Sequence, residues 1–177
     1  MKDKILNKWQ NRLVYGAVAG GILLVYKILM IVFFGNAQTN SSLNIIDMIF
    51  VASLLVVTMT KGINRYREEQ LEGFITYSQG FGQGFFISLI ACVLHDLPTW
   101  VYNSFISATY KEEYLEQSYN MMYEMYGSEM ADSMSTILEN TILTPSYMFF
   151  AMLLSAALTS LILGAVVAIF TKKEKVF

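Results

Sequence analysis

The only histidine of the chain, His95, stands beside Asp96 in the apolar stretch ACVLHDLPTW, residues 91–100. An imidazole next to a carboxylate can exchange a proton, bind an ion or form a hydrogen-bonded pair. Pro98 lies in the same stretch, where a proline removes a backbone donor and kinks a helix. The stretch therefore predicts either a working site or a packed helix kink whose polar groups need partners.

Two more ionisable residues, Lys27 and Asp47, lie in other apolar stretches. A charge near the centre of a bilayer costs at least about 2.5–3.5 kcal/mol, so such residues normally face inward and find partners. With a rise of 1.5 Å per helical residue, Lys27, Asp47 and Asp96 each lie about 18–20 Å from the cytoplasmic boundary. We predict one intramembrane polar layer in which Lys27 bridges Asp47 and Asp96, with His95 nearby.

This layer has two interpretations. It is either a pocket for an anionic headgroup, a proton or a cation, or a structural ion pair beside a kinked helix. Neighbouring residues point about 100° apart on a helix, so we expect His95 and Asp96 not to face one site unless Pro98 turns one of them. Asp96 is therefore the expected member of the layer, and His95 the uncertain one.

The elements that hold this layer are four apolar blocks, at about residues 13–34, 43–60, 84–106 and 147–170. Each is close to the 20 or so residues that cross a hydrocarbon layer of about 30 Å. Only 15% of the residues are charged, against about 25% in soluble domains. We predict an all-α membrane protein, a single domain over residues 1–177 with four transmembrane helices in the lipid bilayer.

The basic residues predict the orientation of these helices. They precede the first block, separate the second from the third, and follow the fourth: Lys2, Lys4, Lys8 and Arg12; Lys61, Arg65 and Arg67; Lys172, Lys173 and Lys175. Because cytoplasmic segments are enriched in Lys and Arg, we expect both termini in the cytoplasm. The basic residues are few and spread out, which gives no indication of a nucleic-acid partner.

The segment at about residues 108–144 is acidic and amphipathic. Tyr119, Met122, Tyr123 and Tyr126 recur at helical spacing, and Gly127 suits a helix end. We predict a short helical hairpin on the outer side, its apolar faces turned toward the bundle or the lipid headgroups. The Tyr/Met stripe is either a surface anchor or a partner-binding face that uses adaptable methionines.

Small residues line faces of the first and last blocks. They are Gly16 and Gly20 in the first block, and Ala156, Ser160, Gly164 and Ala168 in the last. Such faces let helix backbones approach closely in lipid. The sequence leaves open whether they meet within one chain or between the two chains of a homodimer.

Enzyme signatures are absent from the sequence. It contains no HExxH and no GxSxG motif, and one histidine does not supply the usual ligands of a zinc site. We therefore expect no catalytic residues, no metal and no cofactor.

The order of features resembles a known family. A basic Tyr66-Arg67-Glu68 segment precedes FITYSQGFGQGF (Phe74–Phe85), followed by a proline-containing span and a Tyr-rich acidic segment. The most specific part comprises Ile75, Thr76, Tyr77, Gln79, Gly80, Phe81 and Gly84. The chain resembles the uncharacterised four-span bacterial membrane family catalogued as domain of unknown function 4199, common in Bacteroidota. The family brings no established activity.

The resemblance implies a protein of the bacterial inner membrane and suggests an association with a glycosyltransferase that loads sugars onto polyprenyl phosphate. We expect a non-enzymatic accessory or scaffold subunit that binds such a partner enzyme in envelope glycan assembly. The alternative is a small dimeric transporter or lipid-flipping protein that uses the Lys27/Asp47/Asp96 layer.

Overall fold

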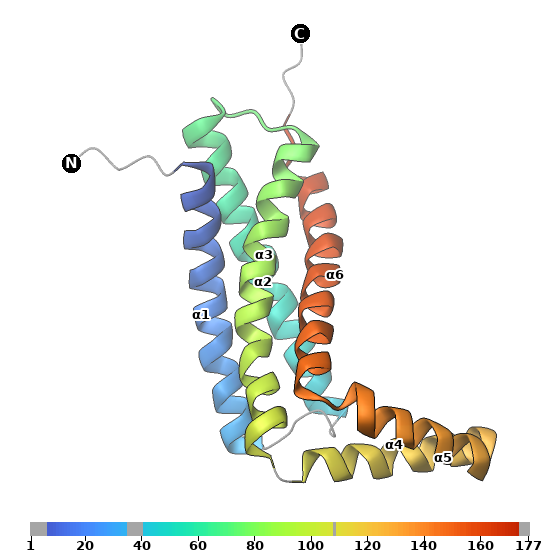
Figure 1. The fold of residues 1–177 in the computed structure, drawn as a ribbon. Helices are drawn as coiled ribbons and strands as arrows, with labels where there is room; N and C mark the ends of the chain where they lie inside the picture. Colours follow the sequence, from blue (N-terminus) through green and yellow to red (C-terminus); the bar gives the residue numbers. More distant parts are fainter. Residues whose placement is uncertain (1–6, 35–40, 108, 174–177) are drawn as a thin grey trace.

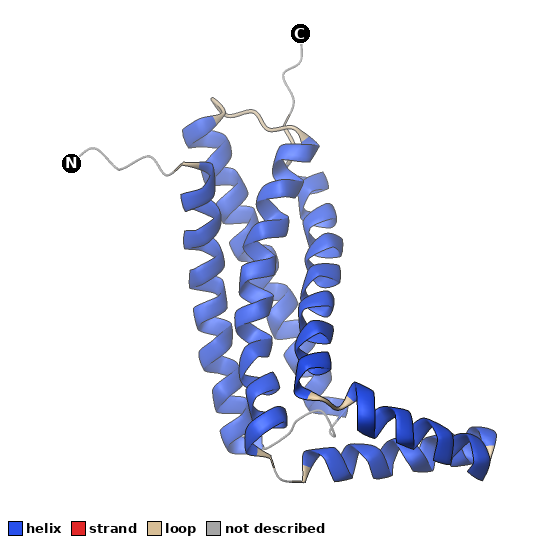
Figure 2. Cartoon of the chain, in the orientation of Figure 1, coloured by secondary structure: helices blue, strands red, loops and turns tan. Residues whose placement is uncertain are grey.

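The protein is a bundle of four long helices with a helical arm at one end (Figure 1). The computed structural model describes residues 7–34, 41–107 and 109–173. The long helices are α1 (Lys8–Phe34), α2 (Ser41–Gln70), α3 (Tyr77–Val101) and α6 (Pro145–Thr171). Each is long and apolar enough to cross a membrane. Nearly all of the described chain is helical (Figure 2), so the prediction of an all-α, multi-pass membrane protein is confirmed.

The helices extend beyond the apolar blocks. α1 begins at Lys8 rather than near residue 13, α2 continues to Gln70 rather than ending near 60, and α3 begins at Tyr77 rather than near 84. A helix needs only its own backbone hydrogen bonds to continue, so it does not stop where the apolar residues stop. The apolar blocks therefore mark the membrane-spanning parts of longer helices.

The start of α3 is fixed by a capping box. The Thr76 hydroxyl accepts a hydrogen bond from the Gln79 backbone N–H at 3.4 Å, and the Gln79 side chain accepts one from the Thr76 N–H at 3.0 Å. This reciprocal arrangement satisfies two N–H groups that a helix start leaves without partners. The Ile-Thr-Tyr-Ser-Gln stretch therefore has a structural reason for its residue types.

Helix α3 is the centre of the bundle and packs most closely against α1 and α6. A Cβ atom added to Gly20 of α1 would come within 2.5 Å of Leu94 Cδ1, and one on Gly16 within 2.9 Å of Ile90 Cβ. On α6, a Cβ on Gly164 would come within 3.2 Å of the Phe85 backbone nitrogen. Both small-residue faces therefore pack on α3 within one chain, and they give no argument for a homodimer.

We predicted a helix kink at Pro98. Helix α3 continues through this residue to Val101. The departure from α geometry follows the proline, in the π-helical segment η2 (Tyr102–Ile106). The Tyr102 N–H is shared between the carbonyls of Pro98 and Thr99. Pro98 therefore lies inside the helix, one turn before its geometry changes.

The arm is a helical hairpin that extends sideways from the bundle (Figure 1). It comprises α4 (Tyr110–Tyr126), α5 (Ser128–Ile137) and the π-helical segment η3 (Leu138–Ile142). Gly127 separates α4 from α5 with a φ of 82°, in the left-handed region that glycine adopts readily. The predicted hairpin and its division after Tyr126 are thus present.

The first residues of α1 and the last residues of α6 lie at the end of the bundle opposite the arm (Figure 1). We call this end the base. At the base, Ile75 and Lys173 exchange two backbone hydrogen bonds of 2.9 Å, which tie the end of α6 to the segment before α3. The cytoplasmic location of the termini stays a prediction, and Lys2, Lys4 and Lys175, which support it, lie outside the described residues.

Candidate ligand cavity

Four ionisable side chains from three helices form a continuous chain of contacts in the arm half of the bundle. Lys27 Nζ lies 2.8 Å from Asp47 Oδ2, and Asp47 Oδ1 lies 3.4 Å from His95 Nε2. His95 Nδ1 lies 2.7 Å from Asp96 Oδ1. Helices α1, α2 and α3 therefore bring their ionisable residues to one place, as the estimated depths indicated.

The order of contacts differs from the prediction. We expected Lys27 to join the two aspartates, but His95 contacts both of them. We also expected His95 and Asp96 not to face one site, yet their side chains bond to each other and line the same cavity. The two nitrogens of the His95 ring point to opposite sides of the imidazole. One of them therefore reaches Asp96, although adjacent residues point about 100° apart on a helix.

The four side chains, all of which line the same cavity, differ in their exposure. The exposed fractions are 13% for Lys27, 14% for Asp47, 7% for His95 and 34% for Asp96. An ionised Asp96 only accepts hydrogen bonds, so the Nδ1 atom of His95 carries the proton in that contact. The most accessible charge is therefore the carboxylate at the end of the chain.

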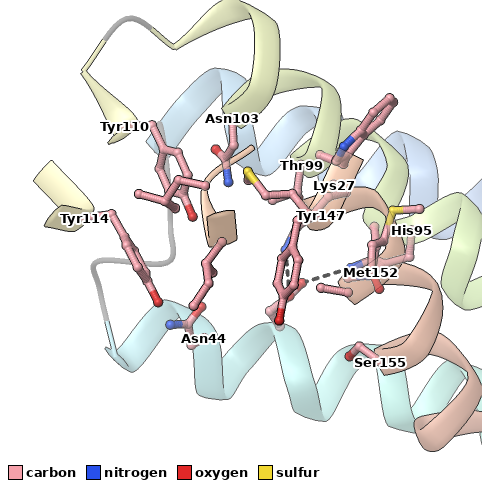
Figure 3. A pocket seen from close by; sticks show the side chains of 17 residues that line it. Lys27, Asn44, His95, Thr99, Asn103, Tyr110, Tyr114, Tyr147, Met152 and Ser155 are labelled. Carbon is pink, nitrogen blue, oxygen red and sulfur yellow. Dashed lines mark hydrogen bonds and ion pairs between the residues drawn. The ribbon is translucent and has the colours of Figure 1, made fainter. Parts of the chain in front are cut away.

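The cavity beside these residues has a volume of about 400 Å³ and lies among α1, α2, α3, α6, η3 and the first turns of α4 (Figure 3). Such a volume falls within the range of small-ligand pockets. Its lining combines the ion chain with amides, hydroxyls, aromatic rings and apolar side chains: Lys27, Asn44, Asp47, His95, Asp96, Thr99, Trp100, Asn103, Tyr110, Tyr114, Ile142, Leu143, Tyr147, Met148, Ala151, Met152 and Ser155.

Aromatic residues form one side of the cavity. Tyr110 and Tyr114 come from α4, Tyr147 from the start of α6, and Trp100 from the end of α3. The Trp100 indole N–H donates to the Pro145 carbonyl at 2.9 Å, so the indole is held between α3 and α6. Burial, together with neighbouring Tyr114, raises the pKa of Tyr110.

The arm residues singled out in the sequence do not belong to the cavity. Tyr119 and Met122 are half-buried, whereas Tyr123 and Tyr126 are 54% and 65% exposed. The hairpin tip extends away from the bundle (Figure 1). The stripe is therefore a separate feature, partly covered and partly open.

Several lining residues were not anticipated from the sequence. Thr99 and Asn103 follow Pro98, and Tyr110 and Tyr147 flank the arm. Tyrosines at such positions are expected as an aromatic belt in any membrane protein, so nothing marked these as cavity residues. These four side chains line one cavity because η2 and η3 return the chain to the same end of the bundle.

Buried polar residues at the base were also not anticipated. Asn11 and Gln83 are 1% and 0% exposed, and the Asn11 amide donates to the Gly62 carbonyl at 2.9 Å. Arg12 lies over the rings of Trp9 and Phe86, 4.6 and 4.5 Å from their centroids. This cluster fastens α1 to α2 and α3.

Within residues 7–34, 41–107 and 109–173, no three His, Cys, Asp or Glu side chains are placed to hold a metal ion.

A family model described as "Protein of unknown function (DUF4199)" matches residues 14–173. The chain belongs to this family. No curated protein and no solved structure matches it. The match to DUF4199 includes every residue that lines the cavity.

Proposed function

We propose that this DUF4199 protein is a non-enzymatic accessory or scaffold subunit of the bacterial inner membrane that binds a partner enzyme through its arm. The observation that carries the proposal is the set of exposed Tyr and Met side chains on α4. Met121, Tyr123, Met125 and Tyr126 are each 54–65% exposed, on a hairpin that stands clear of the bundle (Figure 1). Aromatic residues and methionines are typical of protein-binding surfaces.

The charge of the arm favours a protein over the lipid surface as its occupant. Between Tyr110 and Ile142 the chain has seven acidic residues and one basic residue, Lys111: Glu112, Glu113, Glu116, Glu124, Glu129, Asp132 and Glu139. Anionic headgroups repel such a segment, whereas a basic protein surface attracts it. We therefore expect a partner with a basic patch. A polyprenyl-phosphate glycosyltransferase is the first partner to test, on the strength of the family resemblance.

The test is affinity purification after crosslinking in native membranes. We expect one stoichiometric protein partner with the wild-type chain, and its loss when Tyr123→Ser and Tyr126→Ser are combined. Tyr77→Ser is the matched control, since Tyr77 is also exposed but lies near the base. Recovery of the wild-type protein without a stoichiometric partner would contradict the accessory role.

The ion chain and its cavity favour a second candidate, a small transporter or lipid-flipping protein. A charged intramembrane group that faces a cavity is typical of transport pathways. The base half is close-packed, since a Cβ on Gly84 would lie 3.5 Å from Gly164 Cα, so transport requires a second conformation. The test is uptake or lipid scrambling in reconstituted vesicles. Activity that Asp96→Asn abolishes supports this candidate, and no activity above empty vesicles rejects it.

A further inference from the structure

We propose that the cavity at the arm end binds a ligand that carries an alkylammonium group, with Asp96 as its counter-ion and the aromatic side chains as its walls. This assigns a ligand class to the cavity and does not depend on the accessory role of the arm. Three features of the cavity favour such a ligand: its accessible charge, its lining rings and its size.

The accessible charge in the cavity is negative. Lys27 is held by Asp47 at 2.8 Å, with only 13% of its side chain exposed, whereas 34% of the Asp96 side chain is exposed. One Asp96 oxygen bonds to His95, and a carboxylate accepts several hydrogen bonds. A cationic ligand can therefore bind Asp96 without breaking any contact of the ion chain.

An anionic ligand would find no comparably accessible positive charge in the cavity. Its only full positive partner in the lining, apart from a protonated His95, is Lys27. That ammonium has N–H donors besides the one bonded to Asp47, but only 13% of the Lys27 side chain is exposed. An anion bound there would also lie near the carboxylates of Asp47 and Asp96, which line the same cavity. The geometry thus disfavours ligands with a net negative charge.

The aromatic lining fits an ammonium group as well. Tyr110, Tyr114 and Tyr147 border the space (Figure 3), and Trp100 also lines it. The indole N–H of Trp100 donates to the Pro145 carbonyl and its ring packs against Phe105 and Phe149, so the three tyrosines are the principal aromatic partners for a ligand. Aromatic faces attract ammonium groups, more strongly where water is excluded. A carboxylate with several rings is a usual combination for recognising organic cations.

The size and remaining walls define the rest of the ligand. A space of about 400 Å³ accommodates a headgroup or a small amine but not a peptide chain. Its apolar side is formed by Ile142, Leu143, Met148 and Met152, which suits short alkyl segments. Two sources share this chemistry, a free alkylamine and the ethanolamine headgroup of a phospholipid.

The experiment measures binding to the purified full-length protein in nanodiscs of neutral lipid. The probes are ethanolamine, phosphatidylethanolamine and, as the anionic comparison, phosphatidylglycerol. We expect at least one amine probe to bind and phosphatidylglycerol to bind at least about tenfold more weakly, a factor that one charge-assisted contact supplies. Binding of ethanolamine assigns a free amine, and binding of phosphatidylethanolamine alone assigns a lipid headgroup.

Matched variants connect the binding to the cavity. Asp96→Asn keeps the shape of the side chain and should weaken amine binding about tenfold, whereas Asp132→Asn removes a carboxylate from α5 and should leave it unchanged. Tyr147→Leu should weaken binding and Tyr147→Phe, which keeps the ring, should not. The tyrosine pair keeps the test valid if Asp96→Asn fails to fold. The proposal is overturned if neither amine binds, if phosphatidylglycerol binds as well, or if folded Asp96→Asn and Tyr147→Leu bind like the wild type.

Discussion

The base half and the arm half of the bundle use opposite kinds of packing. In the base half, glycines bring helices into direct contact, as where Gly16 faces Ile87 and Ile90 and Gly164 faces the Phe85 backbone. In the arm half, charged and aromatic side chains hold the helices around a cavity of about 400 Å³. The same four helices thus change from close contact to separation along their length.

This difference separates stability from binding within one small bundle. Close-packed interiors respond to any added volume, because there is no free space to receive it. A cavity lined by ions tolerates changes of volume but depends on charge. We expect substitutions in the base half to act on folding and those around the cavity to act mainly on ligands, and the following predictions test this division.

The largest effect is expected at Gly20. Gly20→Leu would force a side chain against Leu94 and the Ala91 backbone and should lower the free energy of unfolding by about 3 kcal/mol. Gly21→Leu is the control, since a Cβ there meets nothing within 4 Å, and it should change stability by no more than about 0.5 kcal/mol. The measurement is equilibrium unfolding in detergent. Equal effects of the two substitutions would remove the evidence for close packing of α1 on α3.

A smaller effect is expected at Lys27. Lys27→Met leaves Asp47 with His95 as its remaining partner and should lower the unfolding free energy by about 2 kcal/mol, less than for a fully buried pair because the cavity admits water. The exposed Lys61, changed to Met, provides the control and should have little effect. A loss at Lys27 larger than that at Gly20 would show that the ion chain, rather than the close contact of α1 with α3, holds the bundle together.

The helix cap at the base should contribute less. Thr76→Ala removes the hydroxyl that accepts from Gln79 and should lower the unfolding free energy by about 1 kcal/mol. Ser78→Ala, at an exposed position in the first turn of α3, should be close to neutral. Chemical denaturation of both variants measures the difference, and an unchanged Thr76→Ala protein would mean that α3 begins without need of its cap.

The smallest effect on stability is expected in the arm. Tyr126 is 65% exposed, so Tyr126→Ser should change the unfolding free energy of the bundle by less than about 0.5 kcal/mol while weakening capture of a partner. Thermal unfolding and crosslinking of the same sample measure the two effects. A marked loss of stability would indicate that the arm supports the bundle instead of extending from it.

Much of this architecture follows from patterns that report one helix at a time. Apolar blocks of about 20 residues identify the spans, and Gly127 marks the turn between α4 and α5. The depths of Lys27, Asp47 and Asp96 place them in one layer, because position along a straight helix depends only on residue number. These features depend on spacing, which the sequence contains directly.

The features that were missed depend on how helices turn about their axes and on side-chain rotamers. The sequence left the place of His95 in the layer uncertain, whereas in the structure His95 contacts both aspartates. Arg12 and Asn11 look like solvated residues before a span, yet both are at most 4% exposed. Tyr110 and Tyr147 line the same cavity only because the arm returns to the bundle. The residue spacing within one helix does not predict such contacts between helices.

The placement of His95 gives the cavity an intrinsic spectroscopic probe. The chain has one histidine, and its ring lies between the two aspartates of the cavity. In a protein purified without a polyhistidine tag, every imidazole resonance comes from that one ring. Selective isotope labelling of histidine would therefore follow events in the cavity directly, without a substitution or an attached probe.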